Sequence, residues 1–396
     1  MKFLVLIGDG MGDFPLKELD GKTPLMVAKK PYMDMMASRG VCGKVITVPE
    51  GYPPGSDIAC MSLFGYDPKK YYTGRAPIEF YGMGHEMGKD DVAFRCNLVY
   101  LDKKNNKWLM GDYSGGHISK EEAISLISSL NEGIKEESVS FFPGLGYRNI
   151  MLWKNGKWMI ESVPPHDIQG QEIEGYLPKG EGSNFLIEIM EKAKKILSEH
   201  KVNIERRKKG LIPANAIWLW GQGKKADFLP FKERFGLSGA TVCAVDLIKG
   251  ISRLAGFFTP HVEGATGYLD TDYSAKAKKA IELLSDFDVV YIHVEAPDEA
   301  SHEGKIDEKI KAIENIDSKI LGPIYEQKKG ELRFLIVTDH FTPISLKTHY
   351  ASPTPFVIFD ERMGNTSSIS KYDENLSETI YSPDDLLYKF FTKDIP

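Results

Sequence analysis

The sequence predicts an α/β protein in which a doubly wound, mostly parallel sheet is interrupted by a smaller α+β insert. Three near-continuous apolar runs, FLVLIGDG (3–10), DFDVVYIHVEAPD (286–298) and RFLIVTDH (333–340), indicate strands that are covered on both faces. Helical patterns at 28–40, 271–287 and 302–327 lie between or beside them. Strands that alternate with helices favour a parallel sheet with helices on both sides.

The middle of the chain has a different pattern. Short polar-capped strands suggest a hairpin around KKNNK (103–107), and YRNIMLWKNGKWMIES (147–162) suggests a second hairpin with Asn-Gly at its turn. An amphipathic helix is expected at 184–200. We therefore assign 1–82 and 228–396 to the core and 83–227 to the insert, with hinges near 80–90 and 222–230.

Composition limits the classes of partner. The chain has 396 residues and a net charge of -6, which argues against a nucleic-acid partner held by bulk electrostatics. The four cysteines form no CxxC pair, so we expect no cysteine-ligated metal and a reducing cytoplasmic location. The apolar run at 3–7 is too short for a signal peptide, and no stretch suits a membrane span. The oligomeric state is left open.

Side chains that bind metals follow three predicted strands: Asp9, Asp298 and the pair Asp339-His340. Ligands of open parallel sheets bind beyond the carboxyl ends of the strands. Asp298 and His302 are four residues apart, so a helix would present both on one face. The alternative is an acidic residue that complements the helix dipole beside an incidental histidine.

His349 completes a possible ligand set, since it follows His340 by nine residues. A lone histidine is more often structural than a ligand. Carboxylates and imidazoles without thiolates suit Mn²⁺ or Zn²⁺, with Mg²⁺ or Co²⁺ as alternatives. The set contains enough ligands for two divalent ions.

Ser56 permits two interpretations. It precedes a helical pattern in PPGSDIACMSLFGYDP (53–68), where serine is a favoured helix cap. The same position suits a nucleophile, because the amides of a helix N-terminus favour phosphate, and a nearby metal would lower the pKa of the hydroxyl.

Long ordered motifs then connect the chain with a known family: LIGDGMGD, PPGSDIACMSLFGYDPKKYYTGRAPIE, DVAFRCNL, HVEAPDEASHEG, TDHFTP and THYASPTPF. In these it resembles cofactor-independent phosphoglycerate mutases of the archaeal type, within the alkaline phosphatase superfamily. The resemblance implies an alkaline-phosphatase-like core with an inserted phosphotransferase domain. It also implies two metal sites, one with Asp9, Ser56, Asp339 and His340, and the other with Asp298, His302 and His349.

The resemblance further implies a glycolytic isomerase that interconverts 2- and 3-phosphoglycerate through a phosphoserine at Ser56, without bisphosphoglycerate. His117 in SGGHIS is nominated as proton carrier or phosphate contact, against a role as a hydrogen-bonded turn residue. Further candidate contacts for the small phosphorylated carboxylate are Arg75, Arg148, His166, Asp167 and Lys249. For Arg75 the alternative is a structural salt bridge, and for Lys249 it is an ammonium group that reaches water.

One departure concerns the substrate. The longer bacterial branch clamps its substrate with a pair of arginines, whereas the corresponding stretch here, WLWGQGKK (218–225), offers only lysines such as Lys224. Lysine lacks the planar fork of arginine. Two alternative functions stay open: a homoserine kinase-like phosphotransferase, proposed for a sister group that the chain resembles in LIGDGM and TVPEGYPPGSD, and a metal-dependent phosphomonoesterase in which water is the acceptor. A non-catalytic metal-binding protein is disfavoured because the ligand set is intact.

Overall fold

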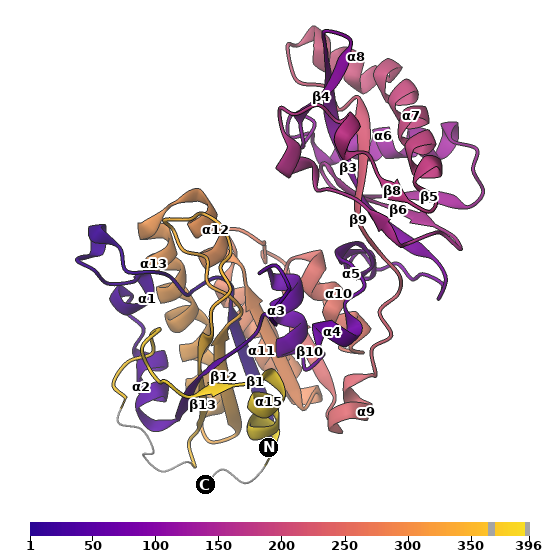
Figure 1. The fold of residues 1–396 in the computed structure, drawn as a ribbon. Helices are drawn as coiled ribbons and strands as arrows, with labels where there is room; N and C mark the ends of the chain where they lie inside the picture. Colours follow the sequence, from indigo (N-terminus) through magenta and orange to yellow (C-terminus); the bar gives the residue numbers. More distant parts are fainter. Residues whose placement is uncertain (363–368, 393–396) are drawn as a thin grey trace. The chain divides into compact units, whose positions relative to one another are not determined.

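The computed structural model describes residues 1–362 and 369–392, and the chain divides into two compact units (Figure 1). The first unit comprises residues 1–72 and 227–396, and the second comprises 73–226. The first junction lies before α5 (Arg75–Gly82), ten residues earlier than the sequence analysis placed it. The reason is that α5 packs on two strands of the second unit, β3 (Val92–Lys104) and β9 (Ala216–Gly223).

The first unit is built on a seven-stranded sheet of order β10-β11-β1-β12-β13-β2-β14. Its strands are β10 (Gly239–Val242), β11 (Val289–Val294), β1 (Lys2–Gly8), β12 (Leu332–Thr338), β13 (Thr354–Asp360), β2 (Val41–Val45) and β14 (Ile380–Tyr381). β10, β11, β1 and β12 are parallel, while β13 runs antiparallel to both of its neighbours. The predicted fold class, a mostly parallel sheet, is confirmed.

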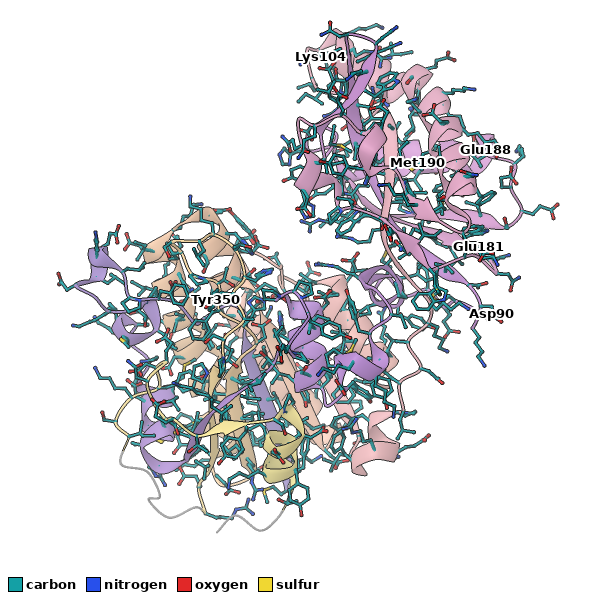
Figure 2. The ribbon with its side chains drawn as sticks, in the orientation of Figure 1. Asp90, Lys104, Glu181, Glu188, Met190 and Tyr350 are labelled. Carbon is teal, nitrogen blue, oxygen red and sulfur yellow. The ribbon has the colours of Figure 1, made fainter. Side chains whose placement is uncertain are left out.

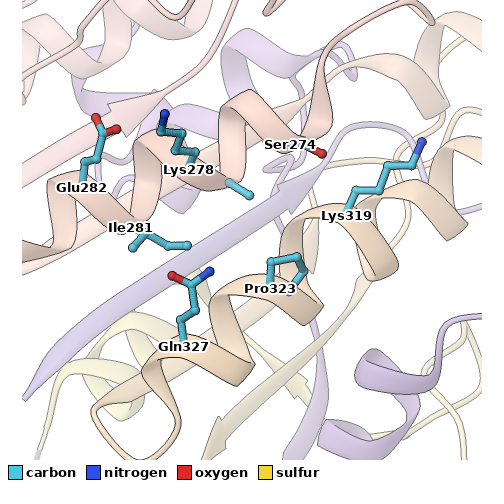
Figure 3. A pocket seen from close by; sticks show the side chains of 8 residues that line it. Ser274, Lys278, Ile281, Glu282, Lys319, Pro323 and Gln327 are labelled. Carbon is cyan, nitrogen blue, oxygen red and sulfur yellow. The ribbon is translucent and has the colours of Figure 1, made fainter.

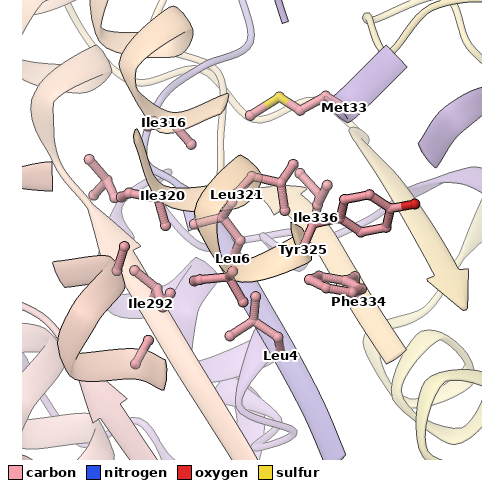
Figure 4. Close-up of a cluster of buried hydrophobic side chains, with 14 of the residues drawn as sticks. Leu4, Leu6, Met33, Ile292, Ile316, Ile320, Leu321, Tyr325, Phe334 and Ile336 are labelled. Carbon is pink, nitrogen blue, oxygen red and sulfur yellow. The ribbon is translucent and has the colours of Figure 1, made fainter. Parts of the chain in front are cut away.

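One face of this sheet is covered by an apolar cluster, shown in Figure 4. Side chains such as Leu4, Ile292 and Ile336 pack there against Ile320 and Leu321. The covering elements are α2 (Pro31–Arg39), α11 (Tyr273–Asp286), α13 (Ile306–Asn315), the π-helix η4 (Ile316–Leu321) and α14 (Gly322–Lys328). The predicted helices at 28–40, 271–287 and 302–327 are confirmed. The last of them consists of the consecutive segments α13, η4 and α14.

The opposite face is covered mainly by aromatic contacts. The rings of Phe64 and Tyr291 stack at 4.3 Å, and Phe3 packs edge-on against Phe390. The helices on this side are α3 (Ser56–Leu63), α10 (Asp246–Leu254) and α15 (Pro383–Phe391). Helices therefore cover both faces, which explains the near-continuous apolar character of the central strands. The remaining helices of this unit are η1 (Lys17–Leu19), α1 (Pro24–Val27), α4 (Pro68–Tyr71), α9 (Phe231–Phe235) and α12 (Ala296–Glu303).

The second unit has its own sheet, of order β4-β3-β6-β5 with β9 paired to β3. Its other strands are β4 (Lys107–Asp112), β5 (Val139–Leu145), β6 (Arg148–Trp153), β7 (Ile160–Glu161) and β8 (Lys179–Gly180). Its helices, besides α5, are α6 (Lys120–Gly133), η2 (Pro165–Ile168), η3 (Glu174–Tyr176), α7 (Ser183–Glu199) and α8 (Lys201–Lys208). The predicted hairpin around KKNNK is present as β3–β4, with Asn105 and Asn106 at positive φ.

The second predicted hairpin is wrong. Asn155 does adopt a positive φ, and a turn forms after β6, but the strand that follows it, β7, pairs with β8. The two edges of β6 are already occupied by β5 and β3. The turn signal was therefore correct, whereas the pairing partner was decided by long-range contacts.

Candidate functional site

The predicted ligand residues lie where the three central strands of the first unit end. Gly8 of β1 is in register with the last residues of both β11 and β12, so the three strands end level with one another. Asp9 follows β1 directly, and Asp339 and His340 follow β12. Asp298 is the third residue of α12, which begins just after β11. Local chain order therefore places three strand ends at one edge of the sheet.

Asp9, Asp339 and His340 form the first cluster. His340 Nε2 lies 3.5 Å from Asp9 Oδ1 and 3.4 Å from Asp339 Oδ2. The other oxygen of Asp339 accepts hydrogen bonds from the backbone amides of Gly10 (3.0 Å) and His340 (2.8 Å). Because those amides fix the carboxylate, its Oδ2 remains directed at the cluster.

Ser56 joins this cluster. Its Oγ lies 3.2 Å from His340 Nε2 and 3.4 Å from Asp9 Oδ2. Gly55, and not Ser56, occupies the N-cap position of α3, and no side-chain hydrogen bond caps this helix. The capping interpretation of Ser56 is therefore wrong, and its hydroxyl faces the carboxylates and the imidazole.

Asp298, His302 and His349 form the second cluster. Asp298 Oδ2 lies 3.1 Å from His302 Nε2, and Asp298 Oδ1 lies 3.6 Å from His349 Nε2. The two Nε2 atoms are 3.0 Å apart. His302 Nδ1 lies 3.0 Å from the carbonyl oxygen of Lys347, which can only accept, so Nδ1 carries a proton and Nε2 faces the cluster.

A short bridge between two segments brings His349 back to the strand ends. Tyr350 donates its amide to the carbonyl of Phe341 at 2.8 Å, and the ring of Tyr350, labelled in Figure 2, packs edge-on against Phe14 at 5.0 Å. The rings of His340 and His349 consequently lie 4.3 Å apart. The segment after β12 thus folds back so that both histidines share one site.

The electrostatics of the two clusters favour cations. Burial and the neighbouring Asp339 and Asp298 raise the pKa of Asp9 well above its usual range. Asp9 Oδ1 is buried and has no hydrogen-bond donor among the described residues. Burial opposes ionisation of Asp298, but hydrogen bonds from His302 and His349 outweigh it and hold the pKa of Asp298 well below its usual range. Three carboxylates at this spacing fit divalent ions, which would supply the missing positive charge.

The distances group the predicted ligands slightly differently from the two metal sites that the family resemblance implies. Ligand atoms of Asp9, Asp339 and His340 lie within 4.8 Å of one another, as do those of Asp298, His340 and His349. His340 therefore belongs to both groups, at the boundary between the two clusters.

The sequence analysis missed a buried set behind the first cluster. Cys60, His293 and Asp339 also have ligand atoms within 4.8 Å of one another. His293 Nδ1 lies 3.3 Å from Glu295 Oε1, and Lys276 Nζ lies 3.0 Å from Glu295 Oε2. Burial raises the pKa of the Cys60 thiol well above its usual value, which disfavours the thiolate. His293 and Glu295 lie at the start of the motif HVEAPDEASHEG, so the sequence did offer a signal for them.

In the second unit, a cationic group surrounds Glu79. Its two carboxylate oxygens contact Arg75 Nε at 2.8 Å and Arg95 Nε at 2.9 Å. The Arg95 guanidinium lies 4.3 Å from the Trp220 ring centre, and burial lowers the pKa of Arg95 to about 10. Arg148 is close enough for its charge to act on both Glu79 and Arg95. Three guanidinium groups against one carboxylate leave a net positive site.

His166 lies beside this cationic group. Its ring packs edge-on against Trp220 at 5.6 Å, and its Nε2 lies 3.6 Å from Asp167 Oδ1. Burial is the largest effect on His166 and lowers its pKa, with the charges of Arg95 and Arg75 acting in the same direction. Of the predicted substrate contacts, Arg75, Arg148, His166 and Asp167 are thus brought together, whereas Arg95 was missed.

The other three candidates occupy separate environments. His117 is exposed at a positive φ of 50° in a turn whose amides bind the Asp112 carboxylate. Lys249 Nζ lies 3.2 Å from Asp246 Oδ1 within α10. Lys224 Nζ lies 3.3 Å from Asp90 Oδ1. For Lys249, this ion pair is a third option beside the two that the sequence suggested.

A separate hollow lies between α11 and the segment η4–α14, as Figure 3 shows. Its lining includes Ser274, Lys278, Lys319 and Gln327, which do not belong to the predicted site. Among the described residues, every helix is too short or too polar to cross a membrane.

The fold and the strand-end geometry together define a class of α/β protein in which an inserted unit interrupts a sheet whose edge gathers carboxylates, imidazoles and a serine hydroxyl. Comparison with known proteins narrows this class. A family model described as 2,3-bisphosphoglycerate-independent phosphoglycerate mutase matches residues 37–203. A probable enzyme of that name from Geobacter sulfurreducens is 50% identical over 94% of both chains, and the one from Methanosarcina barkeri is 48% identical over 94% of both.

Two solved structures share the fold of this chain, and one of them bears the family's name. A protein from Pyrococcus horikoshii aligns with a TM-score of 0.85 at 30% identity, covering 100% of this chain and 99% of that one. A cofactor-independent phosphoglycerate mutase from Thermoplasma acidophilum aligns with a TM-score of 0.68 at 26% identity, over 98% and 99%. The chain belongs to the 2,3-bisphosphoglycerate-independent phosphoglycerate mutase family, and the resemblance found in the sequence is confirmed.

Proposed function

We propose that this protein interconverts 2-phosphoglycerate and 3-phosphoglycerate by transferring the phosphoryl group to Ser56 and back to the other hydroxyl of the same glycerate. The observation that carries the proposal is the position of Ser56 Oγ, 3.2 Å from His340 Nε2 and 3.4 Å from Asp9 Oδ2 at the start of α3. The N-terminus of a helix offers amide donors to phosphate oxygens, although at the start of α3 the Ile58 amide already donates to Asp57 Oδ1 at 3.0 Å.

The residues would act in sequence. Ser56 Oγ would attack the phosphorus of the bound phosphoglycerate in line with the leaving glycerate oxygen; the Ser56 hydroxyl proton would pass to that oxygen as its bond to phosphorus breaks. The glycerate would then turn without leaving, and its other hydroxyl would attack the phosphoserine, its proton returning to Ser56 Oγ as the Oγ–P bond breaks. His117 is our candidate for carrying these protons, since an imidazole can both accept and donate a proton.

Two divalent cations complete the proposed site, with Mn²⁺ or Zn²⁺ preferred and Mg²⁺ or Co²⁺ as alternatives. Asp9, Ser56, Asp339 and His340 would hold one ion, and Asp298, His302 and His349 the other. When bound, the ions would favour the Ser56 alkoxide and neutralise charge on the transferring phosphoryl group. Burial, together with the neighbouring carboxylates, raises the pKa of Asp9, and this supports a cation there.

The cationic group of the second unit is proposed to bind the anionic ends of the substrate. Arg148 is exposed and Arg75 is partly exposed, so their guanidinium groups are accessible to a carboxylate or phosphate. Arg95 is held by Glu79 and Trp220 and would fix the arrangement. This group offers the planar forks that the WLWGQGKK stretch lacks. His166, Asp167 and Lys249 remain candidate contacts, and the reducing cytoplasm remains the proposed location.

The decisive experiment incubates purified protein and Mn²⁺ with 3-phosphoglycerate, without bisphosphoglycerate, and follows both isomers by ³¹P NMR. We expect 2-phosphoglycerate to form without release of free phosphate. Phosphate release equal to substrate loss would replace the proposal with a phosphomonoesterase. Failure to isomerise, together with ATP-dependent phosphorylation of homoserine, would replace it with the homoserine kinase activity of the sister group.

A further inference from the structure

A single threonine hydroxyl connects the two clusters of the site. Thr342 is fully buried, two residues after His340. Its Oγ1 lies 2.5 Å from Asp298 Oδ1 and 3.2 Å from His340 Nδ1. Asp298 belongs to the proposed second ion and His340 to the first. One hydroxyl therefore touches one ligand of each ion.

The direction of these two hydrogen bonds follows from the chemistry of the partners. An ionised carboxylate can only accept, so the hydroxyl proton of Thr342 points at Asp298 Oδ1. The oxygen of Thr342 is then left to accept, and it receives the Nδ1 proton of His340. With its proton on Nδ1, His340 presents an unprotonated Nε2, and that atom is the one 3.2 Å from Ser56 Oγ.

The backbone of Thr342 is held firmly enough to keep the hydroxyl in place. Its amide donates to the carbonyl of Gly12 at 3.1 Å, and its own carbonyl accepts from Lys309 Nζ at 3.0 Å. Lys309 also pairs with Asp13 Oδ2 at 2.8 Å, and both side chains are completely buried. A buried ion pair that also satisfies two carbonyls resists displacement, because removing one partner leaves an unpaired charge.

The chain also makes room for this hydroxyl. A Cβ atom on Gly10 would lie 2.6 Å from Thr342 Oγ1 and 2.7 Å from Asp298 Oδ1, and Gly10 has a positive φ of 60°. A side chain at Gly10 would therefore collide with this pair of atoms. The glycine, the threonine and the aspartate form one close contact between the segment after β1, the segment after β12 and α12.

We propose that Thr342 is a positioning residue shared by both ions: its hydroxyl fixes the tautomer of His340 for one ion and the orientation of Asp298 for the other. This inference rests on the two-ion site of the proposed function. Thr342 is not among the proposed ligands of either ion. Its loss should weaken both ions together, whereas loss of a ligand's own partner, such as the Lys347 carbonyl at His302, should weaken one.

The test compares Mn²⁺ binding to the metal-free, full-length protein and to three variants. Thr342→Val keeps the shape and removes the hydroxyl, and Thr342→Ser restores it. Thr354→Val is the matched control, since Thr354 is fully buried in β13 and its hydroxyl donates to the Val45 carbonyl at 3.4 Å and not to a ligand residue. Free Mn²⁺ is measured by electron paramagnetic resonance, and Co²⁺ absorption reports the ligand geometry.

We expect Thr342→Val to weaken both stepwise Mn²⁺ affinities by about 10- to 100-fold and to change the Co²⁺ spectrum, while Thr342→Ser and Thr354→Val stay near the wild-type protein. If Thr342→Val does not fold, Thr342→Ala replaces it. Wild-type affinity for either ion in the folded variant would overturn the shared role and leave the proposed function intact. A wild-type protein that binds fewer than two Mn²⁺ ions would overturn both.

Discussion

Each of the two units contains a cluster of like charges, but the clusters have opposite sign. The strand-end site of the first unit brings Asp9, Asp339 and Asp298 together, and burial among these carboxylates raises the pKa of Asp9. The second unit gathers Arg75, Arg95 and Arg148 around one glutamate. There the arginine charges overcome the effect of burial and lower the pKa of Glu79. The strand-end site therefore has an excess of negative charge, and the cationic group around Glu79 has an excess of positive charge.

The difference teaches what each site requires to be complete. Glu79 gives the arginines an internal counter-charge through two short ion pairs, so the second unit needs no ion to hold its site in shape. Asp9 Oδ1 has no such donor among the described residues. An unpaired buried charge is costly, so we expect the strand-end site to depend on cations, and we propose that the cationic group is preorganised for an anion.

The largest expected effect comes from Ser56→Ala, because only the strand-end site contains the proposed nucleophile. We expect mutase activity to fall by on the order of 10⁴-fold or more, while at least one Mn²⁺ ion stays bound. The ³¹P assay and metal analysis give the two readouts. Ser62→Ala is the control, since this buried serine of the same helix donates to the Ile58 carbonyl. Retained turnover in Ser56→Ala would exclude the phosphoserine.

Metal removal should destabilise the first unit and leave the stability of the second unit unchanged. A ligand present at 100 times its dissociation constant adds about 2.7 kcal/mol of stability per site, so two ions would add roughly 5 kcal/mol to the first unit. All five tryptophans lie in the second unit, at 108, 153, 158, 218 and 220. Tryptophan fluorescence thus follows that unit alone, while circular dichroism follows both.

Chelation should therefore lower the denaturation midpoint seen by circular dichroism and leave the fluorescence midpoint unchanged. Re-addition of Mn²⁺ serves as the control and should restore the first midpoint. Equal shifts of both midpoints would show that the dependence on cations is not confined to the strand-end site, and the contrast between the units would be lost.

The sequence predicted the strand-end site better than the cationic group, and the reason is chain order. Asp9 and Asp339 directly follow an apolar run and Asp298 comes four residues after one, and parallel strands bring such ends to one edge. Arg95 and Trp220 meet because β3 pairs with β9 across more than a hundred residues, and Glu79 comes from α5. No local sequence pattern predicts a contact between residues so far apart in the chain.

Two further residues show where sequence patterns end. Thr342 lies inside the quoted TDHFTP motif, yet a hydroxyl next to two ligand residues has no distinctive spacing. Asn155 marked a turn correctly, but the pairing of the following strand depended on which edges of β6 were already occupied. In both cases the sequence showed the local feature, a hydroxyl or a turn. The residues or strand that it contacts were determined by the tertiary fold.

The pH dependence of stability should also differ between the units. Burial raises the pKa of Glu374 to about 7, while it accepts hydrogen bonds from Thr23 Oγ1 at 2.8 Å and the Asp13 amide at 3.1 Å. The folded pKa of Glu374 lies above the unfolded value of about 4.3, so its stability contribution is complete below that value and is lost as pH rises through 7. Glu79, with a lowered pKa, contributes stability that is lost on acidification.

Glu374→Gln should flatten the pH dependence of the first unit by roughly 2–3 kcal/mol between pH 5 and 8. Urea unfolding of the metal-free protein, followed by circular dichroism at both pH values, measures this change. The fluorescence transition of the second unit provides the internal reference and should not respond to the substitution. An unchanged slope in the first unit would show that Glu374 ionises at its ordinary pKa.

The smallest effect is expected at the exposed rim of the cationic group. Arg148 lies over the Tyr147 ring at 5.2 Å and donates from Nε to the Tyr147 hydroxyl at 3.1 Å, so its removal leaves the fold intact. Arg148→Ala should raise KM for 3-phosphoglycerate about 10-fold with less change in kcat, because a solvent-exposed guanidinium gives a moderate share of anion binding. Arg207→Ala, an exposed arginine of α8, is the matched control and should leave KM unchanged. If both variants behave alike, the positive charge around Glu79 is a structural feature of the second unit, and the contrast with the strand-end site concerns folding and not the substrate.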